Sequence, residues 1–101
     1  MKLRYTRRAT ERYAAALVHL TEQNPAAALR LFNKAEAALD RLRTFPMLGS
    51  YSREYEQLAV RQIIVEPYRF FYFIDQRRRI VWVLDIWHVA QIPDEPQLPA
   101  P

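Results

Sequence analysis

The sequence predicts an α+β fold in which a short N-terminal strand and an antiparallel two-helix hairpin pack on an antiparallel β-sheet. A C-terminal three-stranded meander supplies most of that sheet. Residues 58–88 contain three short apolar runs, LAVRQIIV, YRFFYFID and RIVWVLDIWH, separated by two short breaks. Breaks of this length are typical of a meander and too short for a βαβ crossover. Two stretches before these runs repeat apolar residues at helical spacing.

The chain has 101 residues, which indicates one domain with one hydrophobic core. Half of the residues are hydrophobic, so disorder of the whole chain is excluded. We expect residues 1–91 to form the single domain. The proline-rich segment IPDEPQLPAP, residues 92–101, is expected to be an extended or disordered tail outside the core.

The first helix is predicted to follow a short strand at residues 2–5. Thr6 can cap the helix, and the helix is expected to end at residues 22–24. One apolar stripe recurs along it at helical spacing. This stripe consists of Ala9, Tyr13, Ala16, Leu17 and Leu20.

The second helix is predicted to begin at Asn24-Pro25, with asparagine at the N-cap and proline at the first helical position. Pro46 ends it, and the short link to the first helix predicts an antiparallel hairpin. Its expected buried stripe is Ala28, Leu31, Phe32, Ala35, Leu39 and Leu42. Gly49, the only glycine, lies in the following loop and is expected to have a positive φ.

The middle strand of the meander carries aromatic side chains on both faces, which predicts a central strand covered on both sides. Pro67 separates it from the preceding strand. The segment Asp75–Arg79 contains no glycine and predicts a loop longer than two residues before the last strand. The helical hairpin can cover one face of the sheet. We expect the other face to stay partly uncovered and to mark a partner site.

The formal net charge is +4 and the sequence pI about 9.8, and arginine supplies nearly all of the positive charge. This composition favours a nucleic acid or an acidic protein as partner, or a basic surface without a specific ligand. The absence of cysteine fits a reducing compartment. No apolar run approaches the roughly 20 residues that span a bilayer. The first residues also lack the apolar stretch of a signal peptide. We therefore expect a cytoplasmic protein with no membrane partner.

Three polar residues lie inside or at the end of the apolar runs: Arg61, Arg69 and His88. Such residues are candidates for a functional site. A structural role is the alternative for each of them. Arg61 could pair with a carboxylate such as Glu56 or Glu66.

Arg69 could instead pair with Asp85 across the sheet, and His88 could be a packing residue. Asp85 interrupts an apolar strand and needs a partner if it is buried. His19 is expected to face solvent. Two histidines in different elements, without cysteine, predict neither a metal site nor a cofactor.

The ordered elements resemble the ParE/RelE superfamily of toxins from bacterial toxin–antitoxin modules. LRYTRRATERY resembles the opening strand and first helix of that family, and NPAAALRLFNKAEAALDRLRTFPMLG resembles its second helix. VRQIIVEPYRFFYFID resembles the paired strands, with Arg61 and Arg69 at positions where the family favours basic residues. IVWVLDIWHVAQ is similar to the last strand, which in many members ends in a histidine. The resemblance covers residues 2–91.

The resemblance implies a type II toxin that forms a hetero-oligomer with a cognate antitoxin. ParE-like members inhibit DNA gyrase, whereas RelE-like members cleave mRNA on the ribosome. RelE-like members often place a tyrosine or a basic residue after the last strand, where this chain has Val89 and Ala90. Arg61 also stands alone where some of those members carry a lysine pair. We therefore favour the ParE-like branch, with a ribosome-dependent nuclease or a degenerate antitoxin-binding domain as alternatives.

Enzymatic activity would require the nuclease alternative, a metal-independent endoribonuclease. An acid and a base must then move protons, and cations must hold the phosphate charge. His88 would be the acid or the base, Arg61 and Arg69 the cations, and Glu66 a weak candidate for the complementary base. Inhibition of gyrase by binding requires no such set, so a non-enzymatic role is favoured.

Overall fold

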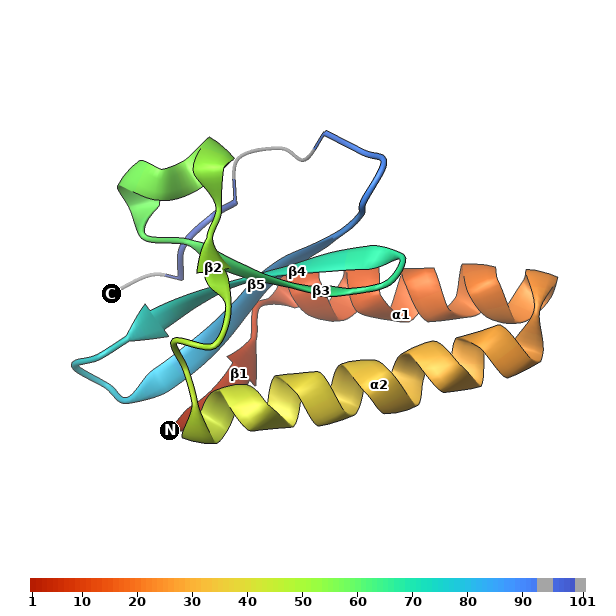
Figure 1. Ribbon diagram of the computed structural model, residues 1–101, viewed down its shortest axis with the longest axis horizontal. Helices are drawn as coiled ribbons and strands as arrows, with labels where there is room; N and C mark the ends of the chain where they lie inside the picture. The colour runs from red at the N-terminus through yellow and green to blue at the C-terminus, as the bar shows by residue number, and fades with distance from the viewer. Residues whose placement is uncertain (93–95, 100–101) are drawn as a thin grey trace.

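The computed structural model describes residues 1–92 and 96–99, apart from the side chains of Glu54 and Glu56. Two antiparallel helices form one layer and cover one face of a five-stranded sheet with strand order β1-β5-β4-β3-β2 (Figure 1). The predicted α+β architecture is confirmed. The prediction for the tail falls partly on residues 93–95 and 100–101, which lie outside the described residues. Pro96, within the described part, is buried.

The predicted meander consists of β3 (Arg61–Val65), β4 (Tyr68–Asp75) and β5 (Ile80–His88), paired antiparallel in that order. The N-terminal strand β1 (Lys2–Tyr5) pairs with β5 in parallel, so the sheet is mixed at this edge. A two-residue strand at the other edge, β2 (Ser50–Tyr51), falls in the predicted loop and pairs with the start of β3.

Helix α1 (Arg7–Gln23) begins where the sequence predicted. The Thr6 hydroxyl oxygen accepts a hydrogen bond from the backbone N–H of Ala9 at 3.1 Å. The same hydroxyl donates to the carbonyl of Leu84 at 2.9 Å. The cap therefore fixes the start of α1 against β5 as well as satisfying a free N–H group.

Helix α2 (Pro25–Thr44) begins at the predicted asparagine–proline pair. The Asn24 side chain accepts a hydrogen bond from the N–H of Ala27 at 3.1 Å. Tyr13 of α1 donates a hydrogen bond to Glu36 of α2 at 3.0 Å. Burial, and then this hydrogen bond, raise the pKa of Tyr13 well above its usual value, so the hydroxyl stays a donor.

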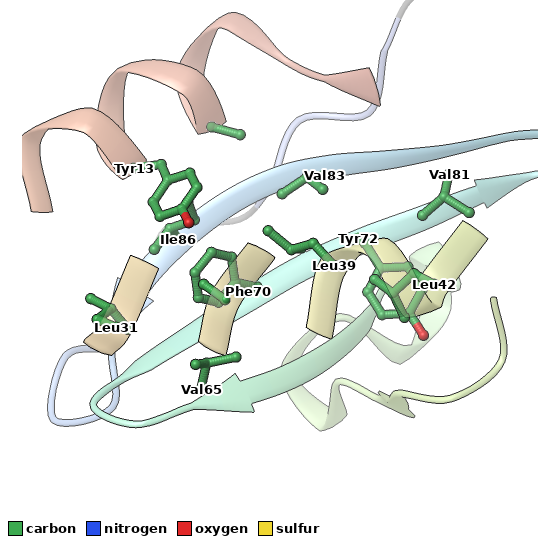
Figure 2. Packing of buried hydrophobic residues seen from close by; sticks show 12 residues of the cluster. Tyr13, Leu31, Leu39, Leu42, Val65, Phe70, Tyr72, Val81, Val83 and Ile86 are labelled. Atoms are coloured by element: carbon green, nitrogen blue, oxygen red, sulfur yellow. The ribbon is translucent and has the colours of Figure 1, made fainter. Parts of the chain in front are cut away.

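The main core lies between the helices and the sheet (Figure 2). Tyr13 packs edge-on against Phe70, with ring centroids 5.5 Å apart. The prediction that Phe32 is buried was wrong, because its side chain is 42% exposed. Phe32 lies at the margin of the α2 stripe and stacks on the outside of Tyr13. The fully or nearly buried members of this core are Ala9, Tyr13, Leu31, Ala35, Leu39, Leu42, Val65, Phe70, Tyr72, Val81, Val83 and Ile86.

A second, smaller core lies on the opposite face of the sheet, around Val60, Phe71 and Leu84. The 3-10 helix η1 (Arg53–Leu58) packs there through Tyr55 and Leu58. η1 therefore covers one part of the face that was expected to stay partly uncovered. The segment between α2 and β3, predicted as a loop, provides this cover (Figure 1).

Gly49 does not have a positive φ, so that prediction was wrong. A Cβ atom at this position would lie 2.5 Å from the carbonyl oxygen of Gln62 and 2.7 Å from the hydroxyl of Tyr72. Glycine is needed here because two backbone segments approach closely. Positive φ values occur instead at Ala59 (56°), shortly before β3, and at Arg79 (55°). Arg79 lies in the loop between β4 and β5, which was predicted to be longer than two residues.

We expect Gly49→Ala to lower the free energy of unfolding by about 2–3 kcal/mol, because the added methyl group displaces Tyr72 and disrupts a buried hydrogen bond. Ala59→Gly should be neutral or stabilising by up to about 1 kcal/mol, because glycine adopts a positive φ without strain. Urea denaturation of both variants measures the contrast. A loss below about 0.5 kcal/mol for Gly49→Ala would contradict the packing argument.

Candidate functional site

Arg61 lies on the helix-facing side of β3, directly opposite Tyr72 in the sheet register. Its Nη1 donates hydrogen bonds to the carbonyl of Gly49 at 2.7 Å and to that of Met47 at 3.4 Å. The guanidinium lies over the ring of Tyr51, 4.1 Å from its centroid. Arg61 therefore holds the segment after α2 against the sheet.

The predicted pair of Arg61 with Glu66 does not form, and the pair with Glu56 stays a prediction. Glu66 is exposed and follows the far end of β3. The side chain of Glu56 lies outside the described part of the structure. Backbone carbonyls and an aromatic ring hold the guanidinium instead.

Tyr72 completes this arrangement from the central strand. Its hydroxyl donates to the carbonyl of Pro46 at 2.7 Å and accepts from the N–H of Gly49 at 2.8 Å. Burial raises the pKa of Tyr72, while the Gly49 N–H and the charge of Arg61 act in the opposite direction. The neutral phenol is the form that can donate and accept at once.

Arg69 lies on the opposite face of the sheet from Arg61. It shares this face with Phe71, two residues further along β4, and its guanidinium is 5.3 Å from the ring of Phe71. Its Nη2 donates to the carbonyl of Gln91 at 2.8 Å. Arg69 thus fastens the segment after β5, and the predicted pair with Asp85 does not form.

Asp85 is fully buried and pairs with helix α1 instead. Nη1 of Arg12 lies 2.8 Å and 2.9 Å from its two carboxylate oxygens, and the N–H of Ile86 donates at 2.9 Å. Nη1 of Arg8 is 3.7 Å away. The guanidinium of Arg12 also lies over the ring of Trp87, 4.4 Å from the centroid. This cluster joins the start of α1 to the last strand.

The sequence contains a signal for this cluster. The prediction that Asp85 pairs with Arg69 did not take it into account. Arg8 and Arg12 are four residues apart and therefore share one face of α1. Asp85 interrupts an apolar strand and requires a cation when buried. Matching the two observations would have predicted the pairing.

His88 ends β5 and packs edge-on against Tyr68, with ring centroids 5.6 Å apart. Its Nδ1 lies 3.1 Å from the backbone nitrogen of Ala90 and accepts that N–H. Because Nδ1 accepts this hydrogen bond, the proton of the neutral imidazole ring is assigned to Nε2. The ring therefore has one nitrogen engaged in local structure.

A groove of about 560 Å³ lies between α1 and the ends of β4 and β5. Its lining is largely apolar and aromatic, and its one arginine, Arg12, is already paired with Asp85, so the groove is suited to an apolar side chain. His19, expected to face solvent, is exposed at its rim. The groove is lined by Arg12, Ala15, Ala16, His19, Tyr68, Ile86, Trp87, His88 and Gln91.

The structure does not bring Arg61, Arg69 and His88 together. In the register of β4, Arg61 is opposite Tyr72 and His88 is opposite Tyr68. Four residues along a strand correspond to about 13 Å, and the two side chains stand on different neighbouring strands. Arg69 lies on the other face of the sheet. The three side chains therefore do not converge on one point.

An apolar patch surrounds the end of α2 and the edge of β3, and we call it the α2–β3 patch. Leu48 is 48% and Ile64 is 55% exposed, and both line one hollow with Arg41. β2 pairs only with the first two residues of β3, so the rest of this edge has no strand beside it in the described structure. The exposed apolar members are Phe45, Met47, Leu48, Tyr51 and Ile64.

Neither a candidate metal-ligand cluster nor a membrane-spanning helix is found in the described part of the chain. No group of three potential ligands among histidine, aspartate and glutamate occurs within residues 1–92 and 96–99. None of the helices described there is both long enough and apolar enough to cross a bilayer.

Comparison with known proteins now identifies the family. The family model described as "ParE toxin of type II toxin-antitoxin system, parDE" matches residues 3–93. The chain belongs to this family. A solved structure described as "Chromosomal ParDE TA system from P. aeruginosa" matches with a TM-score of 0.70 and 22% sequence identity. The match covers 87% of this chain and 95% of that chain, and it shows the same fold. No curated protein gives a significant match.

Family membership confirms the resemblance to ParE-like toxins that the ordered elements predicted. The match to the ParE family model begins within β1 and runs past the end of β5, so it includes residues of every element described above.

The buried cluster gives a stability prediction. Asp85→Ala should lower the free energy of unfolding by about 3–5 kcal/mol, because Arg12 keeps its charge in a partly buried site without a carboxylate. The paired replacement Asp85→Leu with Arg12→Met should cost less than Asp85→Ala alone. Asp40→Ala is the control, because its pair with Arg43 is exposed and such pairs contribute at most about 1 kcal/mol. Urea denaturation would contradict the assignment if Asp85→Ala and Asp40→Ala cost the same.

Proposed function

We propose that this chain is the toxin of a type II toxin–antitoxin pair, that a cognate antitoxin neutralises it in the bacterial cytoplasm, and that the free toxin inhibits DNA gyrase. Membership of the ParE toxin family supports the first part. The separation of Arg61, Arg69 and His88 supports inhibition by binding over RNA cleavage. Cleavage through the ribose 2′-hydroxyl needs an acid, a base and cations around one phosphate.

The local contacts of these three residues support the same choice. Arg61 is committed to the carbonyls of Gly49 and Met47, and Arg69 to that of Gln91. Nδ1 of His88 accepts a backbone N–H. Each side chain thus has a structural role at its own place in the sheet.

The α2–β3 patch is the surface that we assign to the antitoxin. Clustered exposed apolar side chains on a small protein are typical of an interface. The cation Arg41 lines the same hollow, so an acidic amphipathic segment would bury the apolar surface and neutralise this charge. The open edge of β3 would allow such a segment to add main-chain hydrogen bonds.

We expect Leu48→Asp with Ile64→Asp to weaken antitoxin binding about 100-fold, because both substitutions place charges in the apolar centre of the interface. The matched control is Val18→Asp with Leu29→Asp, since these residues are at least as exposed as Leu48 and Ile64 and lie on the helical hairpin away from the patch. Calorimetry with the antitoxin encoded by the neighbouring reading frame measures both affinities. An equal loss in the two double variants would remove the patch from the interface.

The target is tested by inducing the chain alone in a bacterium and following DNA and protein synthesis by pulse labelling. We expect DNA synthesis to fall first, with filamentous cells, because gyrase is required for replication. His88→Ala should keep this toxicity at matched protein level, since no proton transfer is involved. Purified toxin should inhibit supercoiling by gyrase. An early fall of protein synthesis with cleaved messages, abolished by His88→Ala, would instead establish the nuclease.

A further inference from the structure

The outer face of the sheet, opposite the helices, carries a basic and aromatic surface beyond the part that η1 covers. β1 and the loop between β4 and β5 lie at the same end of the molecule as the N-terminus (Figure 1). The backbone N–H of Lys2 donates to the carbonyl of Arg79 at 3.1 Å, which joins the two elements. We call this surface the basic–aromatic face. It consists of the strand residues Lys2, Arg4, Phe73 and Trp82 together with Arg77 and Arg79, which are exposed in the adjoining loop.

The sheet register aligns an arginine and two aromatic rings across three neighbouring strands. Arg4 of β1 is paired with Trp82 of β5, and Trp82 is paired with Phe73 of β4. Leu3 and Val81, the neighbours of Arg4 and Trp82, pack in the helix-facing core. Since side chains alternate along a strand, Arg4, Trp82 and Phe73 share the outer face. Both rings are only partly buried.

The cations of this face are exposed and not engaged by carboxylates. Lys2, Arg4, Arg77 and Arg79 form no ion pair with any residue of the described structure. Arg78 differs, because its Nη1 pairs with Asp75 at 3.1 Å. Its backbone N–H is the main cause of the lowered pKa of Asp75.

The neighbouring acidic groups are also engaged. Glu36 and Asp40 of α2 line a hollow at the β1 edge of the sheet, and Lys2 and Arg4 border the same hollow. Glu36 accepts a hydrogen bond from the hydroxyl of Tyr13, and Asp40 pairs with Arg43 at 3.3 Å. Neither carboxylate forms an ion pair with Lys2 or Arg4 in the described structure, so both cations remain available to a ligand.

We propose that the basic–aromatic face binds single-stranded nucleic acid. Exposed guanidinium groups contact phosphates, and partly exposed rings beside them offer surfaces on which bases stack. An acidic peptide would use the charges but would bury little apolar surface here. Leu48 and Ile64, exposed aliphatic side chains of the kind that such a peptide prefers, lie on the α2–β3 patch. This inference does not rest on gyrase inhibition or on antitoxin binding.

The first test is fluorescence anisotropy of labelled 20-nucleotide oligo(dT) and oligo(U) with the purified chain, freed from any antitoxin. We expect binding that weakens as salt rises. Arg4→Ala with Arg77→Ala should reduce the slope of log K against log salt by about 1.4, since each lost phosphate contact contributes about 0.7 for single strands. The matched control is Arg30→Ala with Lys34→Ala, which removes two exposed charges from α2 and should leave the slope unchanged.

The aromatic contribution is tested with Trp82→Leu, checked for folding by circular dichroism, and with Phe73→Leu as an independent variant. Each should weaken binding severalfold without changing the salt slope, because stacking releases no counterions.

Equal binding of oligo(dT) and oligo(U) would show that the site accepts either nucleic acid, and a preference would assign it to one of them. Equal salt slopes for the double variant Arg4→Ala with Arg77→Ala and for the control Arg30→Ala with Lys34→Ala would overturn the proposal. Competition by polyglutamate at the same charge concentration as oligo(dT) would overturn it too, in favour of an acidic peptide.

Discussion

The central strand β4 imposes the constraint on which the rest of the structure depends. Its side chains are large and aromatic on both faces, so both faces must be removed from water. Phe70 and Tyr72 are buried against the two helices, and Phe71 is buried against Val60 and η1. This requirement places the helical hairpin on one side of the sheet. It also brings the short segment between α2 and β3 over the other.

The close approach at Gly49 follows from the same constraint. Tyr72 is buried with a polar hydroxyl, and a buried hydroxyl needs partners. The segment after α2 provides these partners through its backbone, which lies within hydrogen-bonding distance of the Tyr72 hydroxyl. This close approach leaves no space for a Cβ atom at Gly49. Arg61 then holds the same segment through carbonyls. One aromatic residue of the central strand thereby fixes the path of the chain from α2 into β3.

Local patterns predicted the elements, whereas long-range contacts decided the site. The caps at Thr6 and Asn24, the helical stripes and the central position of β4 depend on neighbouring residues and could be predicted. The partner of Asp85 could not be obtained from strand pairing alone, because the cation comes from a helix 73 residues away in the sequence. The conformation of Gly49 likewise depended on Tyr72, 23 residues further on.

The basic residues of the chain divide according to what surrounds them, and net charge alone could not reveal this. Arg12 neutralises a buried carboxylate, and Arg61 and Arg69 bind backbone carbonyls. These arginines stabilise the fold and have little freedom to meet a ligand. Lys2 and Arg4 stand on an edge strand without such partners in the described structure, so their charge is directed to solvent. The α2–β3 patch lies by the opposite edge strand, β2. Two partners of different chemistry could therefore approach this small sheet from opposite edges without competing for the same side chains.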